Sequence, residues 1–268
     1  MRELNGQELA DFMKERQARQ VRNLIQEHKI KPKLVILRDS DNPVIRVYVQ
    51  KKIAYGADIL IDVEDKFVAT DELAEEIEKA NADDGVYGII VQLPVLTPEL
   101  TEEITGKIAS EKDVDGLGTS GRFDSATATA IDWLLAGYGV ELRGKRLALV
   151  GYGKLVGRPL EKMWVNSGHE VKVFRSKDND SLAVELPKYD VIVTATGKPG
   201  LITSEMVKKD AVVVDAGTAS EKGAVAGDIA EDLRRRKDVL MSAKVGGVGP
   251  LTIAALFDGV IRACLAKI

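Results

Sequence analysis

Short apolar runs alternate with segments of helical periodicity along this chain, and that alternation restricts the fold more than any other feature. Apolar runs at 33–38 and 88–93 predict buried strands, and the segments around them carry apolar residues on one face only. Successive strands that are joined through a helix run parallel, because the connection returns the chain to the same end of the sheet. The sequence therefore predicts the α/β class with mostly parallel sheets.

The same pattern starts a second time beyond residue 129, so two domains are expected. In the first half the predicted helices are 6–29, 43–56, 71–82 and 98–109, and the predicted strands are 33–38, 58–63 and 88–93. In the second half the predicted helices are 129–138, a segment that follows residue 157, and 251–266, and the predicted strands are 145–150, 170–174, 190–194 and 211–215.

Composition narrows the class of protein and its expected location. Of the 268 residues, 45% are apolar and 30% are charged, which is typical of a globular protein. The net charge of -4, with both signs interspersed, argues against a nucleic-acid partner. The single cysteine, Cys264, cannot form an internal disulfide and is expected in the core. We expect no apolar run near the ~18 residues of a membrane helix and no signal segment, and hence a cytoplasmic protein without a membrane partner.

A glycine-rich turn follows the predicted strand 145–150 and precedes a helix. Glycines at 151, 153 and 157 let the backbone turn sharply and approach a pyrophosphate, while the helix N-terminus offers free N–H groups to the anion. The expected dinucleotide contacts in this turn are Gly151, Tyr152, Gly153, Lys154, Val156 and Gly157. The alternative is a tight turn that binds nothing.

The end of the next predicted strand indicates which dinucleotide binds. An acidic residue there suits the ribose hydroxyl of NAD, whereas an arginine suits the 2′-phosphate of NADP. Arg175 and Ser176 occupy the position here, so NADP is predicted and NAD stays possible. The competing interpretation is that Arg175 and Lys177 are solvated loop charges.

Tyr48 and Lys52 are four residues apart on the predicted helix 43–56 and therefore share a face. A lysine that is held beside a ring in a cleft can have a lowered pKa and take part in proton transfer. By spacing alone, however, a lysine on a helix is usually solvated.

Five motifs in order change that interpretation. They are Tyr48-Val-Gln-Lys-Lys52, Val91-Gln-Leu-Pro94, Lys112-Asp-Val-Asp-Gly116, the glycine turn at 151–159, and Gly246-Gly-Val-Gly-Pro-Leu-Thr252. Together they cover nearly the whole chain, and their succession resembles the bifunctional methylenetetrahydrofolate dehydrogenase/methenyltetrahydrofolate cyclohydrolase family.

The resemblance implies a domain plan and an activity. A folate-binding catalytic domain would comprise 1–124 and 251–268, with the last helix packing back on it, and a Rossmann-type NADP-binding domain would comprise 125–250. The activities would be oxidation of 5,10-methylenetetrahydrofolate with NADP and hydrolysis of the methenyl product to 10-formyltetrahydrofolate. Tetrahydrofolate derivatives would be the small-molecule partners, and a sheet edge in the second domain would form a homodimer.

The resemblance also implies roles for single residues. Tyr48 would stack on the folate, Lys52 would handle the attacking water or its proton, Gln92 would hydrogen-bond Lys52, and Asp115 would hold the pterin nitrogens. The loop 246–252 would contribute Gly247, Pro250 and Thr252 to the substrate site. After strand 190–194, Thr196 and Gly197 would contact the dinucleotide. No metal is expected.

Several positions depart from the family pattern, and they leave alternatives open. The turn reads Gly151-Tyr-Gly153 where the family has Gly-Arg-Ser, and Lys154 is the candidate replacement for the lost arginine. The segment before residue 130 lacks the family's Pro-Cys-Thr-Pro-like motif. The alternatives are a member with only one of the two activities, a non-catalytic folate- or dinucleotide-binding regulator, and a dehydrogenase of the amino-acid or shikimate type.

Overall fold

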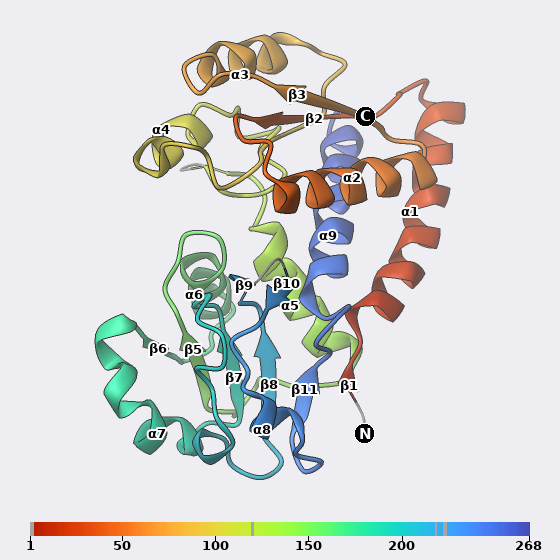
Figure 1. The fold of residues 1–268 in the computed structure, drawn as a ribbon. Helices are drawn as coiled ribbons and strands as arrows, with labels where there is room; N and C mark the ends of the chain where they lie inside the picture. The colour runs from red at the N-terminus through yellow and green to blue at the C-terminus, as the bar shows by residue number, and fades with distance from the viewer. Residues whose placement is uncertain (1–2, 119–120, 218, 222–223) are drawn as a thin grey trace. The chain divides into compact units, whose positions relative to one another are not determined.

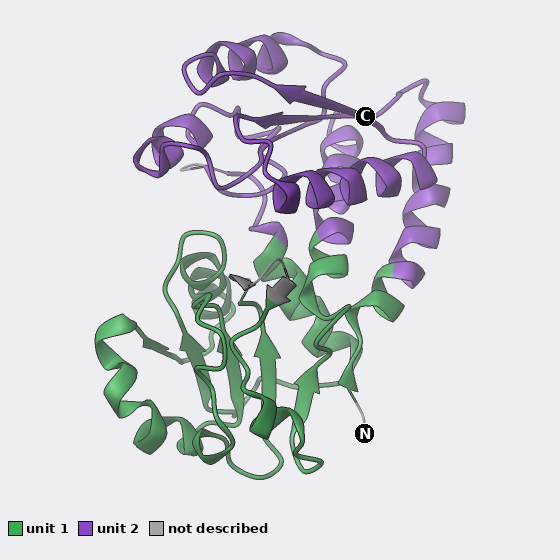
Figure 2. Ribbon diagram, in the orientation of Figure 1, with its two compact units in different colours: residues 1–10, 127–252 green, residues 11–126, 253–268 purple. Residues whose placement is uncertain are grey.

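The chain forms two compact α/β units (Figure 2). The computed structural model describes residues 3–118, 121–217, 219–221 and 224–268. Unit 1 comprises residues 1–10 and 127–252, and unit 2 comprises residues 11–126 and 253–268. The predicted α/β class, the parallel sheets and the return of the last helix to the N-terminal part of the chain are confirmed.

Unit 2 is built on a three-stranded parallel sheet with the order β3–β2–β4. Figure 1 shows β2 and β3 side by side. Its strands are β2 (Lys33–Arg38), β3 (Asp62–Phe67) and β4 (Gly88–Val91). Its helices are most of α1 (Gly6–Glu27), α2 (Pro43–Asp58), α3 (Leu73–Ala82), the 3-10 turn η1 (Pro98–Leu100) and α4 (Thr101–Thr105). The central strand β2 is buried over its four middle residues, which explains why its apolar run was a clear sequence signal.

Two predicted elements of unit 2 were wrong in their bounds. The strand expected at 58–63 lies at 62–67, because the apolar residues 59–61 form the turn that closes α2 and Leu60 adopts a left-handed backbone (φ 65°). The true strand β3 has a polar sequence because it is an edge strand: within the described residues, β2 is its one neighbour in the sheet. The helix expected at 98–109 is interrupted: α4 ends at Thr105, before Gly106.

The last helix, α9 (Val248–Leu265), carries the C-terminal part of the chain into unit 2. Val260 approaches Gly88 so closely that a Cβ there would lie 2.9 Å from the valine side chain. With 18 residues and a mean hydropathy of 1.6, α9 is long and apolar enough to cross a membrane, which corrects the expectation from sequence. However, 67% of it is buried inside the protein, as in a core helix, and Cys264 is fully buried on it.

Unit 1 contains a six-stranded parallel sheet with the order β1–β11–β8–β7–β5–β6. Its strands are β1 (Glu3–Leu4), β5 (Leu147–Val150), β6 (Val171–Phe174), β7 (Val191–Thr194), β8 (Val212–Asp215) and β11 (Leu240–Ser242). A separate antiparallel pair is formed by β9 (Ala219–Glu221) and β10 (Ala224–Ala226). Residues 1–10 belong to this unit because β1 pairs with β11.

The helices of unit 1 follow the strands in the expected alternation. They are α5 (Ala126–Gly137), α6 (Gly157–Asn166), α7 (Leu182–Glu185) and α8 (Glu231–Arg234), with 3-10 turns η2 (Ser176–Ser181), η3 (Leu186–Lys188) and η4 (Ser204–Met206). The strands β5 and β7 are buried over their whole length at the centre of the sheet. Their carboxyl ends carry the glycine turn and the segment 195–197, respectively.

Candidate active site

Lys52 and Gln92 form the centre of the candidate site in unit 2. Lys52 projects from α2, and its Nζ donates a hydrogen bond to Oε1 of Gln92 at 2.8 Å. Gln92 follows β4, and its Nε2 donates to the carbonyl of Leu93 at 3.0 Å. Because the amide nitrogen is committed to that carbonyl, the amide oxygen faces the lysine. The structure thus brings together two residues that lie on different motifs of the sequence.

Asp115 acts electrostatically on the same lysine. Burial lowers the pKa of Lys52, and the negative charge of Asp115 opposes that shift. Burial likewise raises the pKa of Asp115, while Lys52 opposes the rise and the nearby Asp113 adds to it. Both shifts have one cause, since each group loses solvation of its charged form. Among the described residues, no group donates a hydrogen bond to the Asp115 side chain, so its oxygens can serve a ligand.

The residues beside Asp115 in the motif 112–116 have a structural role. Lys112 is only 4% exposed, and its Nζ donates to the carbonyls of Ala80 (3.0 Å), Asn81 (2.7 Å) and Asp83 (2.7 Å) at the end of α3. Asp113 is 1% exposed and accepts the backbone N–H of Gly118 at 2.8 Å. These two buried side chains fix both flanks of the segment that presents Asp115.

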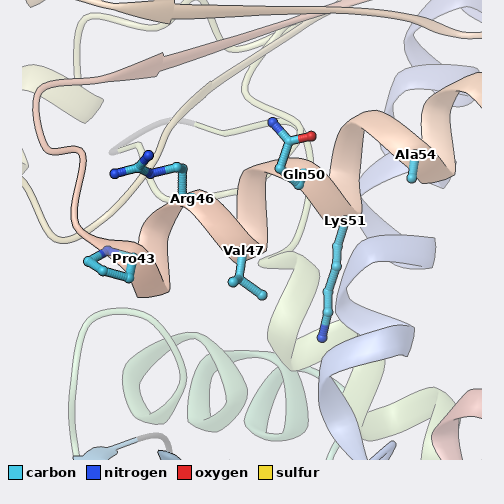
Figure 3. A pocket seen from close by; sticks show the side chains of 6 residues that line it. All are labelled: Pro43, Arg46, Val47, Gln50, Lys51 and Ala54. Atoms are coloured by element: carbon cyan, nitrogen blue, oxygen red, sulfur yellow. The ribbon is translucent and has the colours of Figure 1, made fainter. Parts of the chain in front are cut away.

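Tyr48 lies one helical turn before Lys52 on α2 and is partly buried. A shallow depression of about 700 Å³ lies along another face of the same helix (Figure 3). Its lining residues are Pro43, Arg46, Val47, Gln50, Lys51 and Ala54. At 3.6 residues per turn, these positions centre on the face of α2 that is opposite to Lys52, so the depression is not part of the Lys52 site.

The glycine turn in unit 1 needs its glycines for close backbone approaches. Gly151 adopts a φ of 103°, and a Cβ there would lie 2.4 Å from the carbonyl oxygen of Ala195. A Cβ on Gly157 would lie 2.4 Å from the carbonyl oxygen of Gly151, whereas a Cβ on Gly153 would meet nothing within 4 Å. The helix α6 begins at Gly157. The turn is therefore tightly folded at both ends and open at Gly153, as a backbone cradle for an anion requires.

Arg175 lies next to this turn, at the end of β6. Its guanidinium stacks over the ring of Tyr152 at 4.4 Å from the centroid, and Arg158 lies 5.8 Å from the same centroid. A hydrogen bond to Glu161 raises the pKa of Tyr152, and Arg175 opposes this shift. Ser176 begins the turn η2 directly after Arg175. The stack supports the arginine from one side at the end of β6.

The segment with Thr196 and Gly197 is held by a buried carboxylate that the sequence analysis did not single out. Asp228, which is fully buried, accepts hydrogen bonds from the Thr194 hydroxyl (2.6 Å) and from the backbone N–H groups of Thr196 (2.7 Å) and Lys198 (2.9 Å). Since Asp228 lies 32 residues from Thr196, periodicity gave no signal for it. The contact fixes the path of the segment after β7.

The segment 246–252 is a loop only at its start, which corrects the expectation of a loop throughout. Gly246 has a φ of 80° and its carbonyl accepts the N–H of Gln7 at 2.9 Å, whereas α9 already begins at Val248. Pro250 is compatible with this because the first turn of a helix does not need its N–H. Thr252 lies in the helix and its hydroxyl donates to the carbonyl of Val248 at 3.3 Å.

Comparison with known proteins agrees with this geometry. The family model of the tetrahydrofolate dehydrogenase/cyclohydrolase catalytic domain matches residues 4–115, and that of the NAD(P)-binding domain matches residues 125–268. The bifunctional protein FolD of Hydrogenobaculum sp. (strain Y04AAS1) is 33% identical, over 99% of each chain.

Solved structures extend the similarity to three dimensions. The bifunctional FolD of Campylobacter jejuni has a TM-score of 0.90 and 30% identity over 99% of each chain. The methylenetetrahydrofolate dehydrogenase-cyclohydrolase of Trypanosoma brucei, solved with NADP and an inhibitor, has a TM-score of 0.89 and 25% identity over 98% of this chain and 97% of that one.

Proposed function

Because the chain belongs to the tetrahydrofolate dehydrogenase/cyclohydrolase family, we propose that it oxidises 5,10-methylenetetrahydrofolate with NADP and hydrolyses the methenyl product to 10-formyltetrahydrofolate. The observation that carries the proposal is the hydrogen bond between Lys52 and Gln92 next to Asp115. Lys52 is half-buried in that arrangement, and the partial loss of solvation suits a group that takes part in proton transfer.

In the hydrolytic step we assign proton transfer to Lys52. Water attacks the methenyl carbon of the substrate, the electron pair of its C=N⁺ bond returns to nitrogen, and the water must lose a proton as the carbon–oxygen bond forms. Cleavage of the bond from this carbon to N5, with N5 taking up a proton, then gives the 10-formyl product. A lysine with a lowered pKa is present in part as the neutral amine, which can accept that proton. Gln92 holds the amine in place through its amide oxygen. Asp115 would bind the pterin nitrogens, and Tyr48 would stack on the aromatic part of the folate.

In the oxidation step the dinucleotide accepts a hydride from the methylene carbon, and the protein mainly positions the two reactants. The glycine turn fits a pyrophosphate because Gly151 and Gly157 allow a close backbone approach. We assign Gly153, Lys154 and Val156 to the same cradle. Thr196 and Gly197 would contact the dinucleotide from the end of β7, and Gly247, Pro250 and Thr252 would contact the substrate.

The preference for NADP rests on Arg175 and Ser176. An arginine that is stacked on Tyr152 is held for a bidentate contact with a 2′-phosphate. The test is the ratio of kcat/KM with NADP to that with NAD, measured for Arg175→Ala and for the control Lys177→Ala. We expect the ratio to fall about tenfold or more in the first variant only, because one charge-assisted contact is worth about 1.5–3 kcal/mol. An unchanged ratio in Arg175→Ala contradicts the assignment.

The activity itself is tested with purified protein, methylenetetrahydrofolate and either dinucleotide, with hydrolysis of the methenyl compound followed separately. Lys52→Met should abolish hydrolysis, whereas the neighbouring Lys51→Met should not, because Lys51 lies on the exposed side of α2. Hydrolysis without oxidation in the wild type would favour a single-activity enzyme with an altered glycine turn. Ligand binding without either activity would favour a regulator.

We further propose a cytoplasmic homodimer. β6 supports the dimer, since it lies at the end of the six-stranded sheet with β5 as its one neighbour there, and its backbone can pair with a second copy. Light scattering on the wild type and on Val173→Pro, which removes an N–H from that edge, would test this contact. A monomeric wild type would contradict it.

A further inference from the structure

The segment 92–97, which follows β4 and begins with Gln92, is hydrogen-bonded to a carboxylate at the end of the neighbouring strand β2. Asp39 directly follows β2 and is 3% exposed. Its carboxylate accepts the backbone N–H of Leu96 at 3.0 Å and the hydroxyl of Thr70 at 2.7 Å. We propose that Asp39 is a positioning residue for the hydrolytic step: it holds the segment 92–97 so that the amide oxygen of Gln92 faces Lys52. This inference rests on the proposed hydrolytic function.

The orientation of the Gln92 amide depends on the path of this segment. The Gln92 backbone N–H donates to the carbonyl of Leu37 on β2 at 2.8 Å, which fixes the start of the segment. The Gln92 side chain then donates to the carbonyl of Leu93, and only this contact leaves its oxygen for Lys52. A rotation of the peptide after Leu93 would remove that acceptor, and the amide could turn its nitrogen toward the lysine.

Apolar packing alone does not fix the direction of the segment. Val95 is 3% exposed and packs into the core of unit 2, which sets how deep the segment lies. The next side chain, Leu96, is 66% exposed and adds no anchor. The directional contact comes from its backbone N–H, which donates to Asp39 in place of a strand partner.

The charge of Asp39 is balanced by hydrogen bonds rather than by a cation. In the described ranges of the chain, no lysine, arginine or histidine nitrogen forms an ion pair with its carboxylate. The adjacent Arg38 is directed to Asp65 (2.9 Å) and Asp41 (2.7 Å). A buried carboxylate is costly unless its oxygens are satisfied, so the donors from Thr70 and the segment 92–97 are held firmly.

A double-mutant cycle in the complete chain tests the proposal. We expect Asp39→Ala to lower the hydrolytic kcat about tenfold with a change in KM below about twofold, because reacting groups that are misplaced by a fraction of an ångström lose rate rather than binding. Asp39→Asn, which keeps one acceptor oxygen for Leu96, should recover kcat to within about threefold of the wild type. In a Gln92→Ala background, Asp39→Ala should have no further effect on kcat.

The matched control is Asn81→Ala. The Asn81 side chain also ties two backbone segments of unit 2, by donating to the carbonyl of Lys107 (2.8 Å) and accepting the N–H of Ala109 (3.0 Å). Asn81→Ala should leave the hydrolytic kcat per folded molecule unchanged, both in the wild type and in the Gln92→Ala background. If Asp39→Ala does not fold, Asp39→Ser replaces it, since the shorter side chain cannot reach Leu96 and Thr70 together.

Failure of the inference about Asp39 can be told apart from failure of the proposed hydrolytic function. If the effects of Asp39→Ala and Gln92→Ala on kcat multiply, or if Asp39→Asn is as slow as Asp39→Ala, Asp39 does not act through Gln92 and the inference is overturned. If the wild-type protein does not hydrolyse the methenyl substrate at all, the proposed function itself has failed.

Discussion

The substitution Lys112→Met tests the structural role of the lysine beside Asp115, the proposed ligand of the pterin nitrogens. Lys112 is buried, and its ammonium group donates to three carbonyl oxygens at the end of α3. Methionine keeps most of the apolar stem but leaves these acceptors without a donor. A buried acceptor without a partner costs about 1–3 kcal/mol. Relief of the desolvation that lowers the pKa of Lys112 offsets part of the loss.

We therefore expect Lys112→Met to lower the free energy of unfolding by about 3 kcal/mol, or the Tm of unit 2 by about 10 °C. The control is Lys79→Met on the same helix. The Lys79 side chain is 56% exposed, and its ammonium group pairs with Glu75 and Glu76. Exposed pairs of this kind contribute at most about 1 kcal/mol. Urea denaturation followed by far-UV circular dichroism measures both variants.

The hydrolytic kcat per folded molecule should stay within about twofold of the wild type in Lys79→Met, since Lys79 lies outside the segment that presents Asp115. It should fall in Lys112→Met, because Lys112 fixes one flank of that segment. Equal unfolding midpoints for the two variants would refute the structural role that is assigned to Lys112. A folded Lys112→Met protein with the hydrolytic kcat of the wild type would show that Lys112 does not position Asp115.

Three further predictions concern the two half-sites and the core. Gly157→Ala should abolish oxidation and spare hydrolysis in a coupled assay, because the new Cβ would lie 2.4 Å from the carbonyl oxygen of Gly151 in the glycine turn. Equal loss of both activities would contradict the assignment of oxidation to the glycine turn and of hydrolysis to the Lys52 site. The hydrolytic kcat should rise with pH as Lys52 loses its proton. Asp115→Asn should move this rise to lower pH, because removing the anion lowers the pKa of Lys52 further. A shift of the rise to higher pH would contradict the assigned effect of Asp115 on that pKa. Tyr55→Phe should lower the free energy of unfolding by about 1–2 kcal/mol in urea denaturation, because the Tyr55 hydroxyl donates to the buried amide oxygen of Gln17 on α1 at 2.8 Å. An unchanged free energy of unfolding would mean that water replaces this contact.

The sequence was sufficient for whatever depends on neighbours along the chain. The apolar runs of β2, β4, β5, β7 and β8 were predicted because each strand is buried and its pattern is local. The glycine turn was recognisable because strand, turn and helix follow one another directly. The five ordered motifs indicated the family, which the comparisons confirm.

The tertiary structure decided what depends on contacts between distant residues. β1 and β11 are too short to carry a periodic signal. β1 is a strand because it pairs with β11, Leu4 with Ser242, and β11 in turn pairs with β8 on its other side. The sequence of the motif 112–116 does not distinguish Lys112 from Asp115, because both are charged residues in one short segment. The structure shows that Lys112 caps the end of α3, whereas Asp115 acts on the pKa of Lys52. The roles of Asp39 and Asp228 were missed for a similar reason. Each carboxylate accepts hydrogen bonds from donors that lie far away in the sequence, and only folding brings these donors to it.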